Sequence, residues 1–186
     1  MNDPLAPGQS ILYMKVGTHA NEDLDSIIAR KQEEIDREGY SLWGYGGNTC
    51  HPATMVQPFA RQVAERGDQL VLAMQPMNSK HFAEPVRATQ MSRNGIDWEA
   101  IPDAINALGS RYALAIGSLE HADIDLPLSR TRVAVGNSIG RVGSKYIRGR
   151  VDKACLDIID GEEGGPEVHI GLAAAIVDPY AVFLRN

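Results

Sequence analysis

The sequence has only two cysteines, Cys50 and Cys155, which are too few and too far apart for a disulfide framework. No C-x-x-C motif is present, so a zinc site built on paired cysteines is not indicated, and we expect the reduced protein to be fully folded. A cationic and apolar leader is lacking at the N-terminus. No apolar run approaches the roughly 18–20 residues that span a bilayer. These absences predict a soluble, cytoplasmic protein that makes no membrane contact.

Basic residues are also scarce, and the formal net charge of the 186 residues is −6. This balance argues against general coating of DNA, which requires broad neutralisation of phosphates. Specific binding through one basic patch stays open. The oligomeric state does not follow from the composition.

Residues 130–153, RTRVAVGNSIGRVGSKYIRGRVDK, are the exception to this acidic character, and we call them the basic segment. They contain seven of the 18 Lys and Arg and a single acid, Asp152, which gives a charge of +6 against −12 for the remaining residues. Four glycines leave the backbone free to turn its N–H groups toward an anion, as phosphate-binding loops do. The order of a P-loop is absent, so nucleotide hydrolysis is not predicted.

The side chains of the basic segment suit a nucleotide-like ligand. Arginine offers forked donors and lysine a point charge, and we expect both to bind phosphates. The residues chosen for this role are Arg141, Lys145, Arg148 and Arg150. Tyr146 lies among them and is expected to stack on a base. The alternative is a solvated loop whose charges face water.

A second candidate is the aromatic and glycine-rich stretch at residues 43–47, WGYGG. Glycines between aromatic residues let a flat ligand approach the backbone while a ring covers its face. Trp43 and Tyr45 are therefore predicted ligand-binding residues. The alternative is that both rings belong to the hydrophobic core.

A third candidate is the pair Cys50 and His51 in the loop that follows. A catalytic thiol needs a base or a positive environment that stabilises the thiolate. Neighbours in sequence seldom face each other, so His19 or His81 are further possible bases. No spacing of metal ligands supports a metal site among these residues, and no cofactor is predicted.

Hydrophobic periodicity predicts the secondary structure. A helix over residues 22–38 follows from Leu24, Ile27, Ile28 and Ile35, with Asn21 as N-cap and Gly39 as the closing glycine. A second helix is expected to begin near Gln57, because Pro58 favours a first turn. Further helices are predicted at residues 98–108 and 151–159. Strands are predicted at residues 11–16, 40–46, 69–74, 85–91, 111–119 and 132–135.

This order of elements does not sustain βαβ alternation, so a doubly wound parallel sheet is not expected. The prediction is an α+β domain over residues 1–160, in which a curved mixed or antiparallel sheet, or a small barrel, carries helices at its rim. Residues 161–186 are predicted to be a linker and an apolar tail that packs on this domain.

The order of elements over roughly residues 11–135 resembles the PUA-like superfamily, and its EVE and ASCH branches most closely. The likeness rests on an apolar strand, a helix, a strand bearing Trp43, a helix ending at Gly67-Asp68 and another apolar strand. The resemblance implies a PUA-like barrel that binds RNA or modified bases in a pocket beside it.

Two hypotheses about function follow. The first is a module that binds an anionic nucleotide-like ligand or nucleic acid through residues 43–47 and the basic segment. The second is a cysteine-dependent enzyme that acts on an anionic substrate through Cys50 and a histidine base. Alkylation of the thiol separates them, since it should inactivate the enzyme and leave the binding module largely intact.

Overall fold

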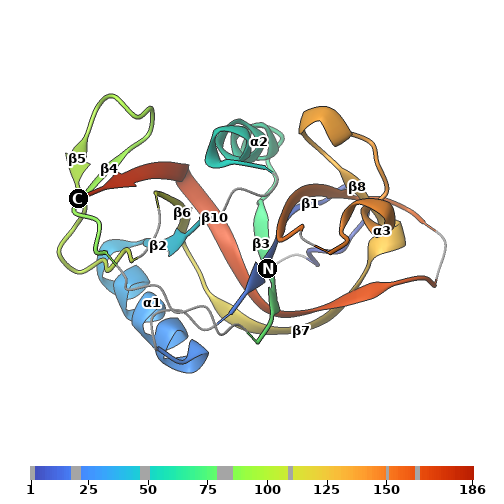
Figure 1. The fold of residues 1–186 in the computed structure, drawn as a ribbon, viewed down its shortest axis with the longest axis horizontal. Coiled ribbons are helices and arrows are strands. Elements are labelled where there is room, and N and C mark those ends of the chain that lie inside the picture. The colour runs from blue at the N-terminus through green and yellow to red at the C-terminus, as the bar shows by residue number, and fades with distance from the viewer. Residues whose placement is uncertain are drawn as a thin grey trace.

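The computed structural model of the protein describes residues 3–17, 22–46, 51–78, 86–108, 111–149, 151–161 and 164–186 (Figure 1). Ten strands form one sheet, and the helices lie around it. The helical elements are α1 (Leu24–Glu38), α2 (Ala53–Glu65), α3 (Gly143–Tyr146) and the short 3₁₀ turns η1 (Leu128–Arg130) and η2 (Gly136–Ser138). The strands are β1 (Ser10–Val16), β2 (Ser41–Gly44), β3 (Val71–Pro76), β4 (Gln90–Ser92), β5 (Glu99–Ala100), β6 (Tyr112–Ile116), β7 (Glu120–Pro127), β8 (Thr131–Val133), β9 (Lys153–Ile158) and β10 (Glu167–Arg185).

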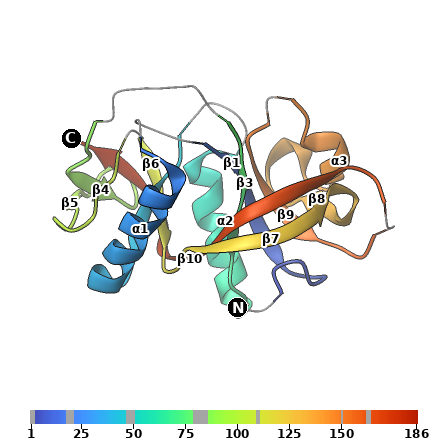
Figure 2. The same ribbon diagram turned by 90° about the horizontal axis from the view of Figure 1, so that it is seen from below.

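The sheet is organised around β10, which crosses the length of the molecule (Figure 1). The main path of neighbouring strands is β2-β6-β10-β3-β1-β9-β8, and β10 also pairs with β7 and β4. β7 runs beside its first half, as Figure 2 shows. β1 and β3 are parallel, and the other paired strands of the described chain are antiparallel. The predicted α+β class is confirmed.

Helix α1 forms where the sequence predicts it. Asp23 caps its first turn by accepting a hydrogen bond from the Ser26 N–H at 2.9 Å, so Asp23 occupies the N-cap position predicted for Asn21, which lies outside the described residues. Gly39 ends the helix in the left-handed conformation with φ of 80°, as predicted. Ile27 and Ile28 are buried in the main hydrophobic core, and Leu24 and Ile35 pack against it.

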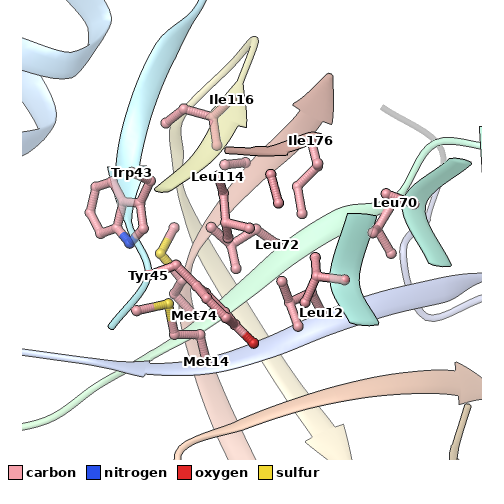
Figure 3. Close-up of a cluster of buried hydrophobic side chains, with 14 of the residues drawn as sticks. Leu12, Met14, Trp43, Tyr45, Leu70, Leu72, Met74, Leu114, Ile116 and Ile176 are labelled. Atoms are coloured by element: carbon pink, nitrogen blue, oxygen red, sulfur yellow. The ribbon is translucent and has the colours of Figure 1, made fainter. Parts of the chain in front are cut away.

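The main hydrophobic core combines side chains of the sheet with side chains of α1 and α2, and Figure 3 shows part of it. Alternate residues of β2 point to opposite faces, so Trp43 packs in this core and Leu42 in a second cluster. A third cluster lies under the basic segment and contains Ile147 and Leu156. Each fully buried aliphatic side chain stabilises the fold by about 1.5–3 kcal/mol relative to exposure.

Two predicted helices are wrong. Residues 98–108 contain the short strand β5 and no helix, and residues 151–159 form β9. β9 lies between β1 and β8 and is buried on both faces, with Cys155 in the main core and Leu156 in the third cluster. The apolar run of Ala154, Cys155 and Leu156 at the centre of β9 is short, and periodicity does not distinguish such a run from part of a buried helix.

The remaining differences concern the ends of elements and two strands, β7 and β10, that are absent from the predicted strands. Helix α2 begins at Ala53 rather than near Gln57, and Pro58 lies inside it. Of the strand predicted at residues 85–91, only Gln90 and Met91 belong to β4, and residue 85 lies outside the described residues. The apolar stretch after residue 166 is β10, which pairs with β3, β4, β6 and β7. Within the described ranges, the chain has no helix of the length and apolar character needed to cross a membrane.

Candidate functional site

The basic segment folds into an ordered lobe at the end of the molecule opposite to α1 (Figures 1 and 2). Its first part is a hairpin at residues 133–141, which we call the basic hairpin. Val133 N–H donates to Arg141 O at 2.9 Å, and Gly140 N–H donates to Val133 O at 2.8 Å. Gly136 and Gly140 turn the chain with φ of 75° and 83°, values that suit glycine. The hairpin is therefore held by its own backbone.

Helix α3 follows the basic hairpin and packs closely on the strand before it. A Cβ atom added to Gly143 would lie 1.8 Å from Oγ1 of Thr131, so this position requires glycine. Thr131 is itself buried and donates to Leu128 O at 2.9 Å. Ile147, directly after α3, enters the third hydrophobic cluster. These contacts fix the backbone that carries the basic side chains.

Three of the four predicted phosphate-binding residues lie on this lobe as exposed cations. Arg141, Lys145 and Arg148 are all exposed, and Arg150 lies outside the described residues. Arg148 Nε donates to Ser144 O at 3.2 Å, which orients the guanidinium. Within the described parts of the chain, none of the three is in an ion pair with a carboxylate.

Lys153, the last cation of the basic segment, is buried instead. Its Nζ atom donates to Gly46 O and lies 3.2 Å from Oδ2 of Asp152. The same ammonium lies 5.1 Å from the centre of the Tyr45 ring, which is a cation–π contact. Lys153 therefore joins the basic segment to the end of β2.

His51 makes a second junction between these two regions. Its ring stacks on Tyr146 with centroids 5.8 Å apart, and Tyr146 Oη lies 3.4 Å from His51 Nε2. The Tyr45 hydroxyl donates to His51 O. Both ends of the connection from β2 to α2 are thus attached to the neighbourhood of the basic segment.

The His51 ring also completes the sheet. Cys155 N–H donates to Nδ1 of His51 at 2.8 Å, where a continued ladder with Ala134 would place a backbone carbonyl. An Nδ1 atom that accepts a hydrogen bond carries no proton, so the neutral ring carries its proton on Nε2. Burial lowers the pKa of His51 and favours this neutral form.

This tautomer bears on the predicted cysteine chemistry. Neither ring nitrogen of His51 has a free lone pair for a proton from a thiol, since Nδ1 accepts from Cys155 and Nε2 is protonated. Cys50, His19 and His81 lie outside the described residues. Cys155 is buried, and burial raises the pKa of its thiol, so it is an unreactive core residue.

The predicted aromatic binding surface is corrected by the structure. Trp43 and Tyr45 are 5% and 3% exposed and pack among Leu12, Met14 and Met74 (Figure 3). A ring covered on its faces by core side chains offers no surface for a ligand to stack on, so the alternative that both belong to the core describes them. Tyr45 instead positions Lys153 and His51.

Two residues of the basic segment have roles that the sequence did not predict. Lys153 was counted only toward the charge of the basic segment, although its place at the start of an apolar run is a signal of burial. Ile139 lies at the tip of the basic hairpin and is 67% exposed. An aliphatic residue between glycines and polar residues is the signal that points to it.

Outside the basic segment, neither a cavity nor a group of metal-binding side chains in the described chain gives a second candidate site. A cavity of about 330 Å³ lies at the ends of the parallel strands β1 and β3, and none of the described residues that line it carries a charge. These residues are Val16, Gly17, Leu24, Pro76, Met77 and Asn78. Over the ranges that the structure describes, no group of three His, Cys, Asp or Glu side chains is placed to hold a metal ion.

Comparison with known proteins identifies no relative. No family model, curated protein or solved structure matches the chain. The function is therefore argued from the geometry of the lobe.

Proposed function

We propose that the protein is a binding module for an anionic nucleotide-like ligand or nucleic acid, with its binding surface on the basic hairpin and α3. The observation that carries the proposal is the state of Arg141, Lys145 and Arg148, which are exposed and in no ion pair with the described carboxylates. They belong to a segment of charge +6 in a chain of net charge −6. Such a separation of charge concentrates positive potential where an anion would bind.

The scaffold beneath these cations supports the proposal. The backbone bonds of the basic hairpin, the close packing of Gly143 on Thr131 and the stacking of Tyr146 on His51 hold the segment in one arrangement. A preorganised site loses less side-chain and backbone entropy on binding than a mobile loop does. This order supports a binding surface rather than a mobile loop whose charges merely face water.

The proposal differs from the sequence-based hypothesis in its aromatic part. Trp43 and Tyr45 are core residues, so stacking on a base falls to Tyr146, which is half-buried between His51 and the surface. The PUA-like assignment, with a pocket beside a barrel, remains part of the proposal and rests on the order of elements in residues 11–135.

A thermal-shift screen against nucleotides, cyclic dinucleotides and short oligonucleotides tests the proposal. A ligand at 100 times its Kd stabilises the folded protein by about 2.7 kcal/mol, which raises the melting temperature measurably. The matched variant replaces Arg141, Lys145, Arg148 and Arg150 with alanine. The control is Arg111→Ala, because Arg111 is exposed and directly precedes β6, and β6 lies toward the other end of the molecule (Figure 1).

The proposal predicts that the quadruple variant loses the shift and that Arg111→Ala keeps it. Equal shifts in both variants would assign the ligand to another surface, and the absence of any shift in the unmodified protein would refute the proposal. Alkylation of the thiols should leave binding intact. Loss of activity on alkylation would favour the cysteine-dependent enzyme instead.

A further inference from the structure

The tip of the basic hairpin carries an aliphatic side chain with no cover. Ile139 is 67% exposed, whereas Val133 and Ile147 of the same segment are buried in the third hydrophobic cluster and Val135 packs against the main core. Exposure of one isoleucine is common on protein surfaces and by itself indicates nothing. Ile139 differs from such residues because it lies on an ordered backbone in a segment that carries exposed cations.

The backbone on both sides of Ile139 is fixed by hydrogen bonds. Ile139 N–H donates to Gly136 O at 3.2 Å, and Arg141 N–H donates to Ser138 O at 3.0 Å. Together with the two bonds between Val133 and the far side of the hairpin, these hold the tip in a defined direction. The hairpin in turn rests on α2, since a Cβ atom added to Gly136 would lie 3.5 Å from Sδ of Met55. Ile139 is thus presented on a rigid support.

The charges around this tip identify the chemistry of the partner. Arg141 follows Ile139 by two residues, and Lys145 and Arg148 lie on α3 and just after it. An exposed aliphatic residue on a segment that also carries three exposed cations fits a polymer that has apolar faces between phosphates, which is the chemistry of nucleic acid. A lipid surface is less well matched, because one isoleucine buries too little apolar area for stable insertion.

The number of cations decides between single and double strands. Insertion of an aliphatic side chain into a duplex must first unstack a base-paired step, whereas bases of a single strand separate at the least cost. Three phosphate contacts from the described residues, or four with Arg150, give little free energy with which to offset the unstacking of a duplex. The single strand is therefore the form that this lobe fits.

We propose that the protein binds single-stranded nucleic acid, with Ile139 inserted between two adjacent bases and Arg141, Lys145 and Arg148 on the flanking phosphates. This inference rests on the proposed function and narrows it from a nucleotide-like ligand to a strand of several nucleotides. A mononucleotide has no base step to receive Ile139, so only a strand would respond to changes at that residue.

Fluorescence anisotropy of labelled single-stranded oligonucleotides of about 16 nucleotides measures the affinity. Ile139→Ala should weaken binding about 5- to 30-fold, because most of an isoleucine side chain would be lost from the contact. Ile139→Leu should restore it. Oligonucleotides that contain 2-aminopurine should brighten when the unmodified protein unstacks the base, and this signal should be lost with Ile139→Ala.

The matched control is Ile96→Ala. Ile96 is 78% exposed at the turn between β4 and β5, at the opposite end of the molecule (Figures 1 and 2), so its removal should leave affinity unchanged. Salt separates the two kinds of contact. The slope of log K against log salt should be about −2 for three phosphates on a single strand. Ile139→Ala should leave this slope unchanged, whereas Arg141→Ala should reduce its magnitude by about 0.7.

Several outcomes would overturn the inference. If strands bind but Ile139→Ala changes neither the affinity nor the 2-aminopurine signal, the insertion of Ile139 is refuted while the proposed function stands. Tighter binding of duplex than of single strand would refute the choice of partner. Binding to phosphatidylserine vesicles that depends on Ile139, with no binding of nucleotides or strands, would refute both proposals.

Discussion

The two ends of the molecule treat their charges in opposite ways. At one end, α1 carries Arg30, Lys31 and Glu34, which are held together in a buried or half-buried network. At the other end, Arg141, Lys145 and Arg148 are exposed on the basic segment without a carboxylate partner among the described residues. The comparison separates charges that hold the fold from charges that are free to bind a ligand.

The charged side chains of α1 are joined by hydrogen bonds to one another and to neighbouring elements. Glu34 is 3% exposed and accepts hydrogen bonds from Arg30, Lys31, the Ser41 hydroxyl and the Asn106 N–H. The Asn106 carbonyl in turn accepts from Arg30 and Lys31. Burial lowers the pKa of Lys31, and the Glu34 carboxylate opposes that shift. These side chains attach α1 to β2 and to the loop before β6.

Removal of Glu34 is expected to have the largest effect on the stability of the fold. Glu34→Ala leaves Lys31 buried without its carboxylate, and we expect a loss of about 3–5 kcal/mol in the free energy of unfolding, measured in urea. Glu33→Ala is the control on the same helix, because the Glu33–Arg37 pair is more than 60% exposed at both side chains. It should change stability by less than about 1 kcal/mol. Equal losses would mean that the buried network has no special weight.

Removal of an exposed cation from the basic segment should weaken binding and leave stability nearly unchanged. Arg141→Ala removes an exposed cation, so stability should change by less than about 0.5 kcal/mol while binding of a labelled single-stranded oligonucleotide weakens. The expected loss of one charge-assisted hydrogen bond is about 1.5–3 kcal/mol, or roughly 10- to 150-fold in affinity. Isothermal titration and urea unfolding of the same variant measure the two quantities. A variant that unfolds more easily but binds normally would place Arg141 with the structural charges.

Gly143→Ala tests whether the basic segment depends on its scaffold. The added Cβ would overlap Oγ1 of Thr131, and we expect a loss of about 1–3 kcal/mol in the free energy of unfolding. Ligand affinity should fall as well, because α3 carries Lys145. Ser144→Ala, the neighbouring change, should affect stability by less than about 0.5 kcal/mol. Unchanged melting of Gly143→Ala would show that α3 shifts freely and that the cations are not preorganised.

The smallest expected effect is the contribution of His51 to the pH dependence of stability. Burial lowers the pKa of His51 in the folded protein, so the unfolded chain binds the proton more readily. Stability should therefore fall as the pH drops below the ordinary value of about 6.5, by at most about 1.4 kcal/mol per pH unit.

The matched variant is His51→Asn, whose side-chain oxygen still accepts from Cys155 N–H and does not titrate. Urea unfolding of the variant between about pH 7 and pH 5 should show a weaker dependence than the parent protein. Parallel curves for the two proteins would mean that His51 does not carry the difference in proton binding.

Local patterns in the sequence were sufficient for part of the fold. Leu24, Ile27, Ile28 and Ile35 predicted α1, because a helix with one buried face repeats its apolar residues every three or four positions. The split of Trp43 and Leu42 to opposite faces of β2 follows in the same way from the period of a strand. The predicted helix at residues 151–159 failed where a strand is buried on both faces and has no such period.

What the sequence by itself determined is the concentration of charge. The basic segment is +6 in any fold, and the glycines at 136 and 140 favour the turns that form the basic hairpin. Which charges are used inside the protein was decided only by the tertiary structure. Lys153 is buried against Gly46 and Tyr45, and Lys31 donates to the backbone carbonyl of Asn106, so both are held by residues far away in the chain. Burial depends on what packs over a side chain, and local sequence does not contain that information.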